Sequence, residues 1–105
     1  MFDELAEELH ETAKSKGFWS NDIDDIFIAK QCMMIVSEVT EVMEAVRKSK
    51  GEEEIAKEIA DILIRTLDLY AGMRKNGYLD ISLDEAFTEK TQFNQTRPEK
   101  HGVRF

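Results

Sequence analysis

The chain has 105 residues, enough for one domain with a single modest hydrophobic core. Hydrophobic residues make up 42% and charged residues 34% of it, a balance typical of globular rather than disordered proteins. The formal net charge of −8 argues against a nucleic-acid partner, because nucleic-acid binding needs a basic face.

The N-terminal and cysteine patterns bear on the compartment. The acidic start lacks the basic residues and apolar core of a signal peptide. No apolar run approaches membrane-spanning length, so no membrane partner is expected. The single cysteine, Cys32, excludes an internal disulfide and favours a reducing compartment. We therefore expect a cytoplasmic protein with one domain over residues 1–105.

The first predicted helix covers residues 2–16, where apolar and charged residues alternate at helical spacing, and Gly17 ends it. Glu7 and His10 have the i, i+3 spacing that di-iron bundles use on two separate helices. This chain has only one such pair, so we interpret His10 as a surface residue.

A short aromatic loop follows at residues 17–21, with Phe18 next to Trp19. Two large aromatic residues in a loop either close the edge of a core or offer a stacking surface for a planar ligand. Both roles stay open for Trp19. Asn21 and Asp22 are candidates for the N-cap of the next helix.

Two long helices form the middle of the chain. The second helix is predicted from about Asp24 to Lys48, and Gly51 separates it from a third helix that runs from Glu52 to about Lys75. The third helix is apolar on nearly every side in its second half, which is typical of a buried helix. Because one small chain cannot cover such a helix, we expect a homodimer or a dimer of dimers.

These two helices carry two acidic pairs with i, i+3 spacing, Glu38 with Glu41 and Glu58 with Asp61. In a helical hairpin the four carboxylates can face one another, where they would repel and raise each other's pKa. A hard divalent cation that takes oxygen ligands removes this conflict. The sequence therefore predicts a metal site at these four acids. The alternative is a thin solvent-facing edge with ion pairs such as Asp61 with Arg65.

Ser82 begins a Ser-x-x-Glu capping box at the start of the fourth predicted helix, and Pro98 stops that helix. Its inward line of residues begins apolar and continues with Lys90 and Asn94, as expected where a helix leaves the core and meets a site. Residues 96–105 form a basic C-terminal tail, which is either a frayed terminus or a phosphate-binding segment. Four helices with short connections predict an all-α, four-helix-bundle-like fold, completed by homodimerisation.

With these features, the chain resembles the MazG-like nucleoside triphosphate pyrophosphohydrolases, which belong to the all-α NTP pyrophosphatase superfamily. The resemblance extends over residues 16 to 105, most of the chain. The matching segments are Lys16-Gly17-Phe18-Trp19, Ile35-Val36-Ser37-Glu38 with Glu41, Glu44-Ala45-Val46-Arg47, Glu58-Ile59-Ala60-Asp61, Ile64-Arg65 with Asp68, Lys90, Asn94, Arg97-Pro98 and His101-Gly102.

The resemblance implies the MazG helical fold and hydrolysis of (deoxy)nucleoside triphosphates between the α- and β-phosphates, to a nucleoside monophosphate and pyrophosphate. It also implies a housekeeping role in the nucleotide pool. Mg²⁺, with Mn²⁺ as the alternative, would be held by the catalytic acids Glu38, Glu41, Glu58 and Asp61. The implied substrate-binding residues are Trp19, Lys30, Arg65, Lys90, Asn94, Arg97 and His101. Among them Trp19 is a candidate for stacking on the base, and the cations are candidates for the phosphates. The preferred base and sugar stay open.

The alternative function is a non-enzymatic helical dimerisation or interaction module whose acids form a solvated surface. That hypothesis predicts no metal dependence and tolerance of Glu58→Gln. A di-metal oxidase or storage bundle would need histidine ligands that the chain lacks, and no glycine-rich phosphate-binding loop is present.

Overall fold

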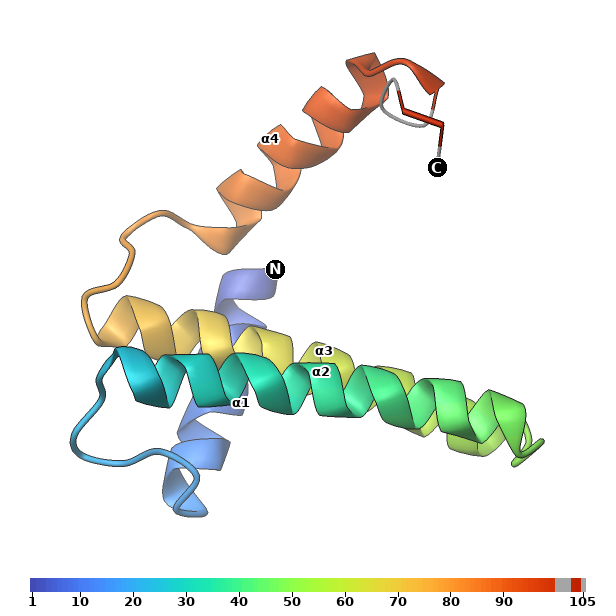
Figure 1. Ribbon diagram of the computed structural model, residues 1–105. Helices are drawn as coiled ribbons and strands as arrows, with labels where there is room; N and C mark the ends of the chain where they lie inside the picture. The colour runs from blue at the N-terminus through green and yellow to red at the C-terminus, as the bar shows by residue number, and fades with distance from the viewer. Residues whose placement is uncertain (100–102, 105) are drawn as a thin grey trace.

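The computed structural model describes residues 1–99, 103 and 104, and within them the chain forms four α-helices and no strand (Figure 1). The helices are α1 (Phe2–Ser15), α2 (Asp25–Arg47), α3 (Glu52–Lys75) and α4 (Leu83–Thr96). This architecture confirms the predicted all-α class. No helix in the described part of the chain is both long and apolar enough to cross a membrane.

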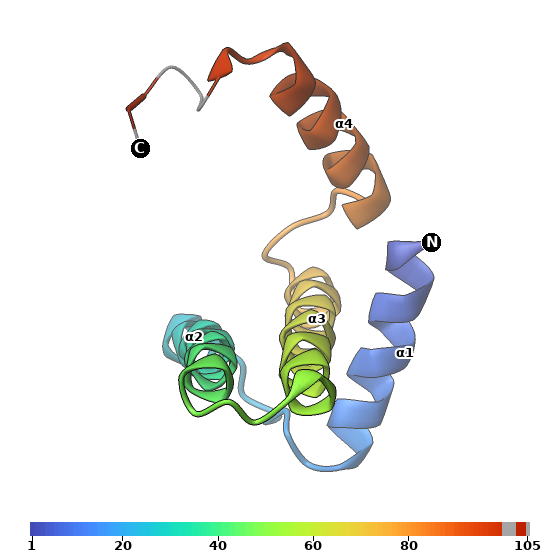
Figure 2. The same ribbon diagram turned by 90° about the vertical axis from the view of Figure 1, so that its right-hand side faces the viewer.

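The central helix of the fold is α3, which packs against α2 on one side and α1 on the other (Figure 2). A small buried cluster of Ala6, Leu67 and Ala71 lies between α1 and α3. Gly51 connects α2 to α3 at a φ of 96°, a left-handed conformation that glycine adopts without steric cost. The two long helices consequently run side by side as a hairpin.

The helix N-termini show which capping predictions hold. Ser82 accepts a hydrogen bond from the N–H of Glu85 at 3.3 Å, which confirms the predicted cap of α4. At α2 the prediction of Asn21 or Asp22 was wrong, because Asp24 is the N-cap and accepts from the N–H of Phe27 at 2.8 Å. Only Asp24 directly precedes the first helical turn, where a side chain can reach that donor.

The first turns of α1 and α4 cap each other. Asp84 of α4 accepts hydrogen bonds from the N–H of Phe2 at 2.7 Å and from the Met1 α-amino group at 2.9 Å. Asp3 of α1 in turn accepts from the N–H of Leu83 at 2.8 Å. Carboxylates at helix N-termini are favourable because the exposed amides and the helix dipole are positive there. From this joint α4 turns away from the α2–α3 pair (Figures 1 and 2).

The single chain is more open than a compact monomer. Its radius of gyration is 16.0 Å, whereas a compact domain of 100 residues has about 13 Å. Its accessible surface is 8004 Å², whereas compact monomers of this mass average about 6,000 Å². Large apolar side chains are exposed along the hairpin at Met33, Val36, Val39, Met43, Val46, Ile59, Leu63 and Ile64. One chain does not cover α3, and the homodimer stays a prediction.

Candidate metal centre and adjoining groove

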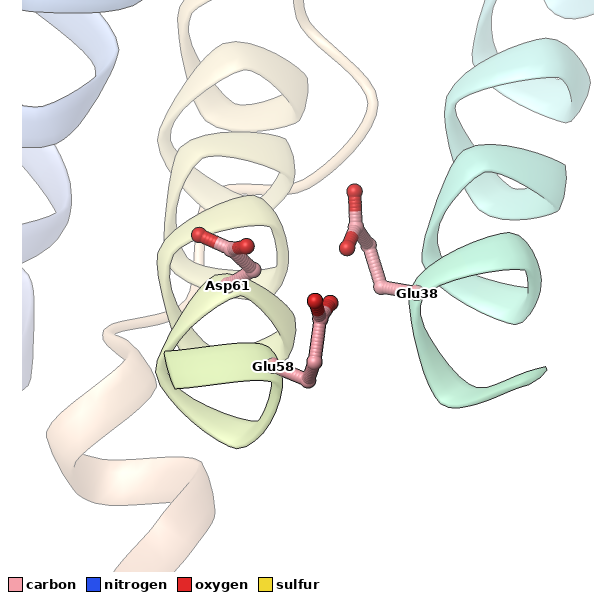
Figure 3. Close-up of side chains that lie close together, drawn as sticks. All are labelled: Glu38, Glu58 and Asp61. Carbon is pink, nitrogen blue, oxygen red and sulfur yellow. The ribbon is translucent and has the colours of Figure 1, made fainter. Parts of the chain in front are cut away.

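Three acidic side chains converge between α2 and α3. Glu38 extends from α2, while Glu58 and Asp61 extend from α3, and their carboxylates turn towards one another (Figure 3). One carboxylate oxygen from each lies within 4.8 Å of the others. The i, i+3 spacing on α3 places its two acids on one side of that helix. The fourth predicted ligand, Glu41, lies beside Glu58 but outside this group of three.

The cluster is electrostatically unsatisfied. The Oε2 atoms of Glu38 and Glu58 are buried and have no hydrogen-bond partner among the residues that the structure describes. The pKa of Glu58 is raised by a hydrogen bond with Glu41, by burial, and by the charges of Glu41, Asp61 and Glu38. Buried carboxylate oxygens without partners are costly unless a cation coordinates them. The residues present therefore fit a hard divalent cation that prefers oxygen ligands.

Arg65 connects the two helices at the edge of the cluster. Its Nε donates a hydrogen bond to Oε1 of Glu38 at 2.9 Å, and both side chains are partly shielded from solvent. The sequence suggested an ion pair between Asp61 and Arg65. Within residues 1–99, 103 and 104, Arg65 instead pairs with Glu38. The contact neutralises one side of the cluster and leaves the opposite oxygen of Glu38 available.

A groove of about 610 Å³ opens beside the acids, between α2, α3, the end of α1 and the aromatic loop. This volume is in the range of small-molecule sites. Four of the predicted site residues line it: Glu38, Asp61, Lys30 and Arg65. Other residues that line the groove were not predicted as site residues, among them Lys16, Phe18, Phe27, Gln31 and Asp68. The sequence carried a signal for three of them, because Lys16 and Phe18 are adjacent to Gly17, and Asp68 follows Asp61 and Arg65 at helical spacing.

Trp19 does not line this groove, although it contacts two residues that do, Phe27 and Asp68. Its side chain is only 8% exposed, and its ring packs so closely on Gly72 that a Cβ there would lie 2.1 Å from the ring. The indole Nε1 donates to both carboxylate oxygens of Asp68, at 2.9 and 3.1 Å. In this structure Trp19 therefore closes the edge of the core, the alternative to stacking on a ligand.

His10 shares the same carboxylate. Its Nδ1 lies 2.9 Å from Oδ1 of Asp68, and its ring stands edge-on to Trp19 with centroids 4.7 Å apart. Only 3% of its surface is exposed, so the interpretation of His10 as a surface residue was wrong. The sequence did not reveal this burial, because the partner of His10 lies 58 residues away on α3 and is brought to it by the packing of the helices.

The remaining predicted substrate residues lie elsewhere. Lys90 and Asn94 are exposed on α4, Arg97 follows that helix, and none of the three lines the groove. The helix α4 that carries Lys90 and Asn94 turns away from the α2–α3 pair (Figure 1). His101 falls outside the described residues.

The family comparison covers most of α2 and all of α3 and α4, but not α1 or the aromatic loop. Residues 29–101 match the model of the MazG nucleotide pyrophosphohydrolase domain, a span of more than two thirds of the chain that includes all four acids. Comparisons with curated proteins and with solved structures gave no match. The chain therefore belongs to the MazG nucleotide pyrophosphohydrolase family.

Proposed function

We propose that the chain is a Mg²⁺-dependent hydrolase that cleaves (deoxy)nucleoside triphosphates between the α- and β-phosphates. The observation that carries the proposal is the group Glu38, Glu58 and Asp61. Two of its buried oxygens have no hydrogen-bond partner among the described residues, and the adjoining groove also carries cations. Family membership supports nucleotide pyrophosphohydrolysis in general. The metal and the position of the cleavage are the finer parts of the proposal.

The same three carboxylates would hold the metal, with Glu41 beside them. All offer oxygen ligands, which suit Mg²⁺, with Mn²⁺ as an alternative. When bound, a divalent cation supplies neutralisation of phosphate charge and acidification of water. The protein contributes by keeping the carboxylates together on two packed helices, so that little reorganisation is needed on binding.

The groove supplies the complementary charge for a triphosphate. Lys16, Lys30 and Arg65 line the same groove as Glu38 and Asp61, and such cations bind phosphate oxygens through charge-assisted hydrogen bonds. The apolar wall includes Phe27 and Phe18, of which Phe18 is 64% exposed. Since Trp19 is buried, Phe18 is the aromatic residue in the better position to stack on a base.

Glu41 is the candidate general base. It is exposed and adjacent to Glu58, whereas Glu38 is held by Arg65. In the proposed reaction a water oxygen attacks phosphorus at the α–β bridge and its proton passes to Glu41. The bridging P–O bond breaks, and the groove cations Lys30 and Arg65 stabilise the charge that develops on pyrophosphate.

The test is a screen of ribo- and deoxyribonucleoside triphosphates with and without Mg²⁺, measuring all phosphorus products. We expect nucleoside monophosphate and pyrophosphate only when the metal is present. Glu58→Gln and Asp61→Asn should each lose activity by roughly 100-fold or more. Glu53→Gln, the same chemical change at an exposed position of α3, is the matched control and should retain activity. Release of orthophosphate, or full activity in the folded site variants, would contradict the proposal.

A further inference from the structure

The groove continues past the acids to an end that the proposed chemistry does not use. On α2, Gln31 lies seven residues before Glu38. On α3, Asp68 lies seven residues after Asp61. The two helices form an antiparallel hairpin, so both steps lead in the same direction (Figures 1 and 2). Seven residues make nearly two helical turns and extend about 10 Å. Gln31 and Asp68, which both line the groove, therefore share one level of it away from the acids.

This end of the groove suits a nucleoside better than the phosphates. The carboxylate of Asp68 repels phosphate oxygens. Phe27 belongs to the same end, because Trp19 contacts both Phe27 and Asp68. An aromatic ring in a groove accepts the face of a planar base. With the phosphates held by a cation at the acids, the base would extend towards Gln31 and Asp68.

Asp68 is held in place by two buried side chains. Trp19 Nε1 donates to Oδ1 at 2.9 Å and to Oδ2 at 3.1 Å, and His10 Nδ1 lies 2.9 Å from Oδ1. The carboxylate itself is only 13% exposed. A carboxylate has about four acceptor positions, and these contacts use two on Oδ1 and one on Oδ2. The acceptor position left on Oδ2 can only receive a hydrogen bond, because a carboxylate has no proton to donate.

We infer that Asp68 selects the base of the triphosphate and favours an amino group at position 4 of a pyrimidine or position 6 of a purine. The inference rests on the proposed function, since it names the substrates of the same site. An amino group donates to a carboxylate, as the N4 amino group of cytosine does to Asp or Glu in DNA recognition. An oxo group would instead turn its lone pairs towards a charged acceptor that is shielded from water, which weakens binding. Cytosine and adenine are therefore favoured over uracil and hypoxanthine.

Gln31 would contact the same base without choosing between amino and oxo groups. Its amide offers an acceptor oxygen and a donor nitrogen, and it can rotate to present either one. The amide therefore matches an amino or an oxo group about equally well. Asp68 supplies the discrimination, whereas Gln31 adds affinity for every base.

Pairs of substrates that differ in an amino or an oxo group test the inference. The quantity is kcat/KM for CTP against UTP and for ATP against ITP, at one Mg²⁺ concentration. We expect the wild type to prefer the amino member of each pair by about 10-fold or more. Asp68→Asn removes the acceptor-only group and should bring both ratios close to one, chiefly by changing KM. A wild type that lacks the preference in one or both pairs, or an Asp68→Asn variant that keeps them, would overturn the inference.

Two further variants separate recognition by Asp68 from a purely structural role. Gln31→Leu should lower kcat/KM for all four substrates and leave both ratios unchanged. Asp22→Asn makes the same chemical change at an exposed loop position outside the groove and should behave like the wild type. Each ratio compares two substrates on one preparation, so partial unfolding of Asp68→Asn does not alter it. Preferences that vanish in Gln31→Leu or in Asp22→Asn would reject Asp68 as the selecting residue.

Equilibrium binding distinguishes failure of this inference from failure of the proposed function. Cleavage of all four triphosphates with equal efficiency would leave the proposed function standing and reject the inference. If none is cleaved, calorimetric titration of the wild type with the same triphosphates and Mg²⁺ replaces the kinetic assay. We then expect CTP to bind more tightly than UTP, and ATP more tightly than ITP, with both differences lost in Asp68→Asn. Equal affinities within the pairs, or no binding, would reject the inference together with the reaction.

Discussion

Arg65 donates a 2.9 Å hydrogen bond from Nε to Oε1 of Glu38, while Oε2 of the same carboxylate is buried without a partner among the described residues. One oxygen is therefore held by the protein and the other remains free to bind a ligand. This division would orient the carboxylate for the proposed cation, because supporting residues that fix a ligand increase metal affinity.

Replacement of Arg65 by Met should destabilise the protein without metal. The change keeps much of the aliphatic stem but leaves both oxygens of a largely buried Glu38 without a charged partner. We expect the free energy of unfolding in urea to fall by about 1–3 kcal/mol, with part of the loss recovered on adding Mg²⁺. Arg47→Met is the control, because its ion pair with Glu44 is exposed and should contribute under about 1 kcal/mol. Equal effects of the two changes would contradict this account of Arg65.

Glu58 should make the stability of the metal-free protein depend on pH. Its pKa is raised above the ordinary value of 4.5, chiefly by the hydrogen bond with Glu41. A carboxyl with a raised pKa in the fold contributes stability below pH 4.5, and that contribution is lost as the pH rises through the raised value. Without metal, the melting temperature of Glu58→Gln should therefore fall less over this window than that of the wild type.

Added Mg²⁺ provides the second half of the Glu58 test. At pH 8 it should raise the melting temperature of the wild type, because only the folded chain assembles the ligands. Glu58→Gln should respond much less, while Glu53→Gln should respond like the wild type. A metal response that is the same in all three proteins would place the binding site elsewhere.

Asp3 should stabilise the joint between α1 and α4 most strongly near neutral pH. Hydrogen bonds from the hydroxyl of Ser82 and from the N–H groups of Leu83 and Asp84 hold its pKa well below the ordinary 3.8, although burial opposes them. This contribution is present above pH 3.8 and is lost as the pH falls through the lowered pKa. Asp3→Asn keeps a hydrogen-bond acceptor but removes the charge, so it should lower the free energy of unfolding by about 0.3–1 kcal/mol at pH 7.

The pH dependence separates capping by Asp3 from a general packing effect. The difference between wild type and Asp3→Asn should shrink as the pH is lowered below about 4. Asp80→Asn, an exposed change in the preceding loop, should have a much smaller effect at pH 7. A difference for Asp3 that is constant with pH would show that its charge is not what stabilises the joint.

Gly72→Ala should reverse the usual effect of this substitution. In an ordinary helix interior, Ala is more stable than Gly by about 1 kcal/mol. Here the added Cβ would lie 2.1 Å from the ring of Trp19, which is also hydrogen-bonded to Asp68. Displacing this buried ring should destabilise the protein by about 1–3 kcal/mol. The measurements are urea unfolding and the emission spectrum of Trp19. A stabilised variant with an unchanged spectrum would contradict the close packing of Trp19 on Gly72.

The amino-acid sequence by itself determined the four helices and their bounds to within two residues, and the N-cap at Ser82. It also predicted that two acidic pairs would meet; Glu38, Glu58 and Asp61 form one group, and Glu41 lies beside it. These features depend on local regularities: helical periodicity, turn residues, and an i, i+3 spacing that holds wherever a helix forms. The apolar character of α3 belongs to the same group, whereas the exposure of Ile59, Leu63 and Ile64 is visible only in the structure.

The tertiary structure alone decided which distant residues share a partner. His10 and Trp19 both meet Asp68 from 58 and 49 residues away, and this made His10 buried and Trp19 part of the core edge. It also paired Arg65 with Glu38, and turned α4 away from the α2–α3 pair, so that Lys90 does not line the groove of its own chain. Such pairings depend on how whole helices pack, because a side chain's partner on another element is set by inter-helix geometry rather than by its neighbours in the chain.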